Sequence, residues 1–218
     1  MITSTSDGKA LRMRGFLVLR ALRNSQPSDP PATTSRTATH RSRSDSGVEQ
    51  MLSGGDPRSL HGVDRVIAVV LADPRALEAL FECLFCDDAV VRMRAGDALE
   101  KIARIRPELL APFTRRLLSD VVDVDQPSVQ WHLAQILTEI ELTPQQRPRA
   151  VAILKRNLER HEDWIVLNLT LHALAQFVRD DPELRRELVP VLRRHQADTR
   201  KSVAKRATKL LAQLQQTL

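Results

Sequence analysis

The cysteine pair Cys83 and Cys86 has the C-x-x-C spacing that serves zinc binding and thiol–disulfide chemistry. A structural zinc site needs four ligands, and no second pair of cysteines or histidines follows at a suitable spacing. Both cysteines also lie in an apolar stretch with helical periodicity, residues 79–86. We therefore expect no metal and no cofactor. We interpret the pair as small buried side chains in a reducing compartment, with metal or redox use as the alternative.

Motifs for other catalytic chemistry are not found in the sequence. It contains no Gly-x-Ser-x-Gly elbow, no phosphate-binding loop, no Gly-x-Gly-x-x-Gly and no His-Glu-x-x-His. The carboxylate pairs Asp87-Asp88 and Asp180-Asp181 fall at expected helix starts, where capping and the helix dipole explain them. The sequence therefore predicts no catalytic residues and a protein that is not an enzyme.

Any functional residue has to be positioned by a block of apolar side chains that recurs along the chain at intervals of 38, 37 and 37 residues. Within each copy the apolar positions follow at offsets 4, 7, 8 and 11, which share one face of a helix. Four copies of one helical face predict an array of stacked helices. The copies are Val91, Ala95, Ala98, Leu99 and Ile102; Val129, Leu133, Ile136, Leu137 and Ile140; Val166, Thr170, Ala173, Leu174 and Phe177; and Val203, Ala207, Leu210, Leu211 and Leu214.

Prolines and capping residues divide this array into helix pairs. Asp73, Thr143 and Asp181 each precede a proline at the expected first helical position, and Thr143 with Gln146 makes a capping box. Pro107 begins a further unit after a poorer cap. The expected units are residues 74–105, 107–141, 144–180 and 182–217, with second helices beginning near Asp88, Pro127, Asp163 and Asp198, and with an N-terminal cap helix over residues 60–72.

The segment Asp88–Leu99 resembles the second helix of HEAT repeats, with an acidic start, a Val-Arg pair and spaced alanines. Pro112, Pro148 and Pro190, inside expected first helices, are similar to the bend of HEAT first helices. The resemblance covers residues 60–217. It is to short bacterial repeats, because the interval here is 37 or 38 residues, whereas HEAT and armadillo units usually span about 40 to 47 residues. It implies an all-α, right-handed α–α superhelix of four helix pairs plus the cap helix. It also implies scaffold or adaptor work, although some bacterial relatives are lyases or DNA glycosylases.

One polar face of the second helices is the candidate partner-binding surface. Offsets 3, 6 and 10 from each leading valine share a face that differs from the apolar stripe, and second helices usually line the concave side of curved arrays. We call these positions the ladder; simple solvation of a polar helix face is the alternative. The candidate binding residues are Arg94, Asp97, Lys101, His132, Gln135, Glu139, His172, Gln176, Arg206 and Lys209, and Leu169 and Gln213 complete the ladder.

The last unit carries a second candidate site, the basic patch, formed by Arg186, Arg193, Arg194, Lys201, Lys205 and Lys209. A row of cations at helical spacing can contact phosphates with strongly salt-dependent affinity, and a solubilising C-terminal cap is the alternative. Residues 182–218 contain no aromatic side chain for base stacking, which disfavours sequence-specific single-strand binding. The two tryptophans, Trp131 and Trp164, take different offsets in their helices, so we expect no matched cradle for a flipped base.

Charge is unevenly distributed over the 218 residues, whose formal net charge is +6. Residues 182–218 carry nine Lys or Arg against three Asp or Glu, whereas residues 51–181 are mildly acidic. No stretch approaches the roughly 20 apolar residues that a membrane-spanning helix needs. We therefore expect a cytoplasmic protein without a membrane partner and with a basic C-terminal unit.

Residues 1–56 differ in kind from the remainder, because residues 24–55 are dense in Ser, Thr, Pro, Gly and Arg and have no apolar period. We expect a disordered basic leader with a short amphipathic helix over residues 9–23, followed by a HEAT-like repeat domain over residues 57–218. An organelle transit peptide is one alternative. A start codon assigned too far upstream, with Met51 opening the folded part, is the other.

The sequence thus predicts a non-enzymatic adaptor or scaffold that binds another protein along a concave face, with the basic unit steering an acidic partner. The alternative function is nucleic-acid binding, with or without DNA-glycosylase-like activity.

Overall fold

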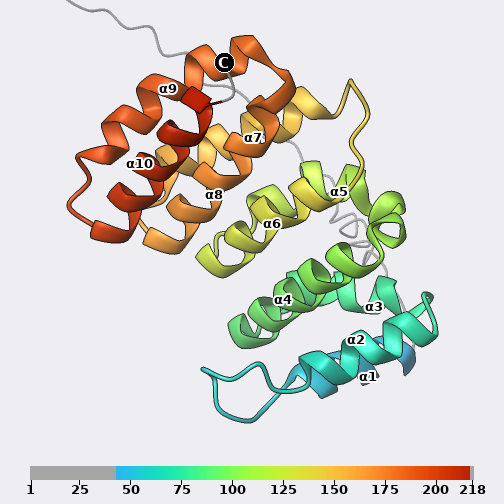
Figure 1. Ribbon diagram of the computed structural model, residues 1–218. Coiled ribbons are helices and arrows are strands. Elements are labelled where there is room, and N and C mark those ends of the chain that lie inside the picture. Colours follow the sequence, from blue (N-terminus) through green and yellow to red (C-terminus); the bar gives the residue numbers. More distant parts are fainter. Residues whose placement is uncertain (1–42, 217–218) are drawn as a thin grey trace, which may run out of the picture. The chain divides into compact units, whose positions relative to one another are not determined.

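The computed structural model describes residues 43–216, and every regular element in that range is a helix (Figure 1). The expected helix over residues 9–23 and most of the expected leader lie outside the described residues. None of the described helices is long and apolar enough to cross a membrane. The α-helices are α1 (Arg43–Leu52), α2 (Val63–Ala72), α3 (Ala76–Glu82), α4 (Ala89–Ile105), α5 (Thr114–Ser119), α6 (Pro127–Glu139), α7 (Arg147–Arg160), α8 (Trp164–Phe177), α9 (Pro182–Gln196) and α10 (Lys201–Gln216). The short 3-10 helices are η1 (Cys83–Phe85), η2 (Pro107–Phe113), η3 (Val121–Asp123) and η4 (Val178–Asp180).

Side-chain caps start several helices where the sequence predicts them. The Asp88 carboxylate accepts from the backbone N–H of Val90 at 2.7 Å, and Asp163 does the same for Ile165 at 2.8 Å. These bonds satisfy backbone donors that the first helical turn leaves unpaired. The hydrogen bonds of the expected capping box also form, but in the turn before α7, which begins at Arg147: Thr143 N donates to Gln146 Oε1 at 2.9 Å, and Gln146 N donates to Thr143 Oγ1 at 3.2 Å.

The recurring apolar blocks form the core between successive second helices. Helix α4 packs against α6, α6 against α8, and α8 against α10 (Figure 1). Nineteen of the twenty side chains in these blocks are buried, and Leu214 in the last turns of α10 is partly buried. The prediction of one equivalent helical face per copy is therefore confirmed by burial.

The first helices are less regular than the second ones. Helix α7 packs on α8 and α9 on α10, but the first part of the unit at 107–141 is split into η2 and α5. Pro112 lies inside η2, and a proline removes a backbone donor and fixes its own φ, which explains why this segment is not one α-helix. Pro190 lies inside α9 as expected, whereas Pro148 falls in the first turn of α7, where a proline causes no mid-helix bend.

The boundary expected at residue 56 is wrong, because α1 belongs to the packed structure. This helix contacts α3 and α2, and it buries Val48 and Leu52, which are 3% and 0% exposed. The cap helix expected over residues 60–72 begins later, at Val63. Leu60, which the prediction included in this helix, precedes it and is 48% exposed. The N-terminal flank of the array is therefore covered by two helices, α1 and α2.

Candidate functional site

Arg94, the first residue of the predicted ladder, is not on a binding surface. Its side chain is fully buried, and its guanidinium donates four hydrogen bonds to backbone carbonyls of the segment between α1 and α2. Nη1 donates to Leu52 O at 2.6 Å and Gly54 O at 2.7 Å, Nη2 to Asp56 O at 2.7 Å, and Nε to Ser59 O at 3.0 Å. The ladder face of α4 is covered because α1 and α2 pack against this helix. Arg94 is a structural clamp, and its assignment to a partner-binding surface is wrong.

His132, another residue of the predicted ladder, is also buried. It packs against the backbone of α4 at Gly96. It is 7% exposed, and a Cβ placed on Gly96 would lie 3.0 Å from its Cδ2 atom. Burial lowers the pKa of His132 to about 4, because the charged imidazolium would lose its hydration; nearby Asp97 opposes this shift and Lys101 adds to it. The ring is therefore neutral near pH 7 and belongs to the core. Asp97 itself pairs with Lys101 at 2.7 Å along α4.

A polar network joins Gln135 and Glu139, the remaining ladder residues of α6, to Glu100 and Arg104 of α4, which lie outside the ladder. Glu100 is 4% exposed; it accepts from Gln135 Nε2 at 3.1 Å and pairs with Arg104. Arg104 also lies 3.8 Å from Glu139. Burial raises the pKa of Glu100, and Arg104 opposes the shift. Charges on this part of the ladder largely compensate one another, so it offers little net field to a partner.

The ladder residues of α8 and α10 lie together and remain accessible. Gln176 and Lys209 are exposed, and His172 and Arg206 are half-buried. Burial lowers the pKa of His172, and the positive charges of Arg206 and Lys209 lower it further. Gln176 Nε2 lies 3.4 Å from His172 Nε2, which links two positions one helical turn apart. This half of the ladder therefore has a positive environment.

The basic patch on α9 and α10 is exposed at all six positions. Among the described residues none of the six forms an ion pair with a carboxylate. Arg200, between the two helices, differs: it pairs with Asp198 at 2.7 Å, and its hydrogen bonds lower the pKa of Asp198 to about 2. The six cations of the patch thus have no carboxylate oxygen within 4.0 Å in the described chain, although Arg194 lines a pocket together with Glu159 and Glu187.

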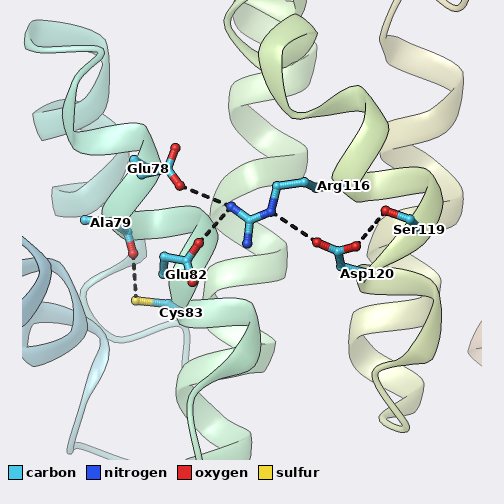
Figure 2. Close-up of polar contacts among 7 residues, drawn as sticks. All are labelled: Glu78, Ala79, Glu82, Cys83, Arg116, Ser119 and Asp120. Carbon is cyan, nitrogen blue, oxygen red and sulfur yellow. Dashed lines mark hydrogen bonds and ion pairs between the residues drawn. The ribbon is translucent and has the colours of Figure 1, made fainter. Parts of the chain in front are cut away.

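Arg116 forms a cluster that sequence reasoning missed, and it is shown in Figure 2. Its guanidinium pairs with Glu82 at 2.7 Å, Glu78 at 3.1 Å and Asp120 at 3.3 Å, and it lies 4.6 Å from the Phe81 ring centroid. The only local signal for this cluster in the sequence is the spacing of Glu78 and Glu82, four residues apart on one helix face. The arginine that binds both carboxylates lies 34 residues after Glu82 and 38 after Glu78. The cluster ties α3 to α5, and Ser119 Oγ donates to the Asp120 carboxylate at 2.6 Å beside it.

The two cysteines are buried thiols in the described structure. Cys83 Sγ donates to Ala79 O at 3.3 Å (Figure 2), and Cys86 Sγ donates to Asp88 O at 3.5 Å. Burial raises the pKa of Cys86, so the reactive thiolate is disfavoured there. In residues 43–216 no group of three or more His, Cys, Asp or Glu side chains is arranged to hold a metal ion.

The tryptophans occupy different environments. Trp131 is half-buried, with its ring centroid 5.6 Å from that of His132, whereas Trp164 is 52% exposed at the start of α8.

Comparison with known proteins places the chain by its fold alone. No protein-family model matches, and no curated protein matches. Among solved structures, the crystal structure of an engineered protein from the Northeast Structural Genomics Consortium is similar, with a TM-score of 0.53 and 21% sequence identity. The match covers 79% of this chain and 81% of that chain. At this identity the similarity concerns the arrangement of the helices and carries no function.

Proposed function

We propose that this protein is a non-enzymatic adaptor, built as a right-handed HEAT-like superhelix, that binds an acidic partner protein through its C-terminal helices. The succession of contacts from α4 to α6, α8 and α10 supports the repeat architecture, because each second helix packs on the next one along the chain. The burial of one recurring apolar stripe supports it as well.

The observation that carries the proposal is the basic patch on α9 and α10, which forms no ion pair with a carboxylate in the described chain. Lys201, Lys205 and Lys209 form a row on α10 opposite its buried stripe, and all three are exposed. Like charges that lack partners repel one another, and an acidic surface would offset this repulsion and accelerate encounter. The binding surface that we propose is therefore the basic patch together with the accessible ladder residues Gln176 and Arg206.

The N-terminal half of the predicted ladder is left out of this surface. Arg94 and His132 are buried, and Glu100, Gln135 and Arg104 interact with one another. A partner would have to break these contacts before it could use them, at a cost that exposed cations do not impose.

Nucleic-acid binding is the second candidate, because the same six cations could contact phosphates. Single-stranded nucleic acid is disfavoured because α9 and α10 contain no aromatic side chain on which a base could stack, so duplex DNA is the form to compare with an acidic protein. Base excision has less support still, since Trp131 lies beside the buried ring of His132.

The test compares fluorescent poly-glutamate with a duplex DNA of about 20 base pairs, each titrated at about 50 and about 200 mM salt. The parent chain should bind poly-glutamate, and Lys201→Gln/Lys205→Gln/Lys209→Gln should weaken binding about tenfold or more. The control, Arg58→Gln/Arg65→Gln/Arg160→Gln, makes the same charge change at exposed positions of other helices or loops and should stay within about threefold.

Two results would contradict the proposal. Tighter binding to DNA than to poly-glutamate, lost as salt rises, would favour the nucleic-acid function. An equal loss in both triple variants would show that binding follows net charge and not this surface.

A further inference from the structure

A cavity of about 380 Å³ lies where the end of α8, η4, the start of α9 and the end of α10 meet. Figure 1 shows α8, α9 and α10 next to one another at the C-terminal end of the described chain. The polar residues that line the cavity are His172, Gln176, Arg179, Arg185 and Gln213. Its volume falls in the range of about 300 to 1,000 Å³ that small-molecule sites occupy.

The polar lining is cationic. Two arginines line the cavity, the His172 ring beside them is held towards its neutral form, and none of the described lining residues is a carboxylate. Arg206 and Lys209 on α10 add to this field, since both act to lower the pKa of His172. An anion in the cavity would experience attraction from every charged group that lines it.

Two nitrogen atoms at this cavity are buried without hydrogen-bond partners in the described part of the chain. They are Nη2 of Arg185 and Nδ1 of His172. A buried donor on a charged guanidinium that lacks an acceptor is costly, and native structures rarely leave one unpaired. At the rim, Arg179 Nη2 donates to Gln176 Oε1 at 3.4 Å, a long contact.

The remaining wall is apolar and selects among anions. Ala175, Val178, Leu210 and Leu214 complete the lining. A fully hydrated ion such as phosphate would lose water against these side chains without compensation, whereas an alkyl chain would gain from contact with them. The combination of a guanidinium with an apolar wall fits a carboxylate that carries a short hydrocarbon chain.

We propose that this cavity binds an organic carboxylate, with Arg185 pairing to the carboxylate and the hydrocarbon chain lying against Leu210 and Leu214. The carboxylate could be that of a free small molecule or of a residue in a bound protein, and the chemistry of the site is the same for both. The cavity shares Gln176 with the surface proposed for the adaptor function, but the inference depends on Arg185, which is not part of that surface.

The experiment uses the full chain and follows the ring signals of His172 by NMR during titration with hexanoate. Hexanamide, of the same length but uncharged, and inorganic phosphate are the comparison probes. Hexanoate should bind saturably at one site, and hexanamide and phosphate should each bind about tenfold more weakly or less.

Arg185→Gln should weaken hexanoate binding about tenfold or more, whereas Arg186→Gln, the neighbouring exposed arginine outside the cavity, should stay within about twofold. Arg179→Gln, at an exposed rim position, serves as a second variant if Arg185→Gln proves unfolded by circular dichroism; it should weaken binding by a smaller but measurable factor.

If poly-glutamate displaces hexanoate, the natural carboxylate belongs to a residue of a bound protein. If poly-glutamate binds while hexanoate stays bound, the natural carboxylate belongs to a free small molecule. The Lys201→Gln/Lys205→Gln double variant, which keeps Lys209 near the cavity, should weaken poly-glutamate binding but keep hexanoate binding, which separates this proposal from the adaptor function. Equal binding of hexanoate and hexanamide, no saturable binding, or unchanged affinity in both cavity variants would overturn it.

Discussion

The Arg94 guanidinium is a buried cation stabilised by backbone carbonyl dipoles, and within residues 43–216 it forms no ion pair with a carboxylate. Its four carbonyl partners come from one short stretch, Leu52 to Ser59, so a single side chain holds the whole connection between α1 and α2. A rigid fork with several donors can satisfy such a ring of acceptors, which a single ammonium cannot do.

Arg94→Met should lower the free energy of unfolding by about 3 kcal/mol or more, because it leaves four carbonyls without their donors. Arg94→Lys should fall between the parent and Arg94→Met. Urea unfolding followed by circular dichroism measures the differences. Arg65→Met, at an exposed position of α2, is the control and should stay within about 0.5 kcal/mol of the parent. A loss below about 1 kcal/mol in Arg94→Met would show that the clamp is dispensable.

The buried ring of His132 makes stability depend on pH. Its pKa is lowered from 6.5 to about 4. Between these pH values the ring is therefore protonated in the unfolded chain and neutral in the folded chain. Stability is therefore fully present above pH 6.5 and falls as the pH drops towards 4, by about 3 kcal/mol from this group. His161, His172 and His195, whose pKa values burial also lowers, contribute in the same direction.

His132→Gln should lose less stability than the parent between about pH 7 and about pH 4.5, because it removes the largest of these contributions. Urea midpoints at both pH values give the comparison, and His61→Gln, at an exposed position, should keep the parent's dependence. Parallel curves for the parent and His132→Gln would contradict burial of a neutral ring.

At the scale of elements, the connection between α1 and α2 depends on backbone conformation. Gly54 and Gly62 both have positive φ, 73° and 78°. At Gly62 an added Cβ would lie 1.8 Å from the carbonyl oxygen of Met51, whereas nothing lies within 4 Å of an added Cβ at Gly54. A substitution at Gly54 therefore measures the cost of a positive φ alone. A substitution at Gly62 measures that cost together with a steric clash.

Gly54→Ala should cost about 1 kcal/mol of unfolding free energy, from backbone strain alone. Gly62→Ala should cost about 3 kcal/mol or more, because α1 must also move away from the new methyl group. Thermal unfolding of the two variants side by side checks this difference. Equal losses would mean that the start of α2 shifts freely relative to α1.

Elements were predictable where the signal is local. Asp88 and Asp163 cap helices as their positions indicate, and Thr143 and Gln146 exchange the expected hydrogen bonds in the turn before α7. Helix α1 was missed because Val48 and Leu52 stand in a Ser- and Gly-rich context whose average composition indicates disorder. Their burial depends on α3, which lies later in the chain.

The candidate site was less predictable, because a helix face that is polar in the sequence is exposed only if nothing covers it. Periodicity separates the ladder from the apolar stripe on every second helix, but it cannot show that α1 and α2 cover the ladder on α4. At the other end α10 has no later described helix packed over its outer face, and Lys201, Lys205 and Lys209 are exposed as expected.

At the scale of the whole molecule, contacts link helices to their neighbours, so damage should stay local. Leu210 is 3% exposed in α10, which packs against α8 and α9. Leu210→Ala should cost about 2 to 5 kcal/mol locally. Amide hydrogen exchange should become faster in α9 and α10 and stay unchanged in α2 and α4.

Leu99→Ala in α4 is the matched comparison, because α4 packs against both α2 and α6. Leu99→Ala should make amide hydrogen exchange faster in both α2 and α6. A uniform rise across all helices in Leu210→Ala would instead indicate a single cooperative unit.

The placement of the two tryptophans provides an optical probe. The sequence has no tyrosine, so the near-ultraviolet emission of the unlabelled protein comes almost wholly from two indoles. Trp164 is largely in water, whereas Trp131 is held on α6 next to the ring of His132. The long-wavelength part of the spectrum is thus an internal reference, and the short-wavelength part reports on the surroundings of Trp131 in α6 without any dye.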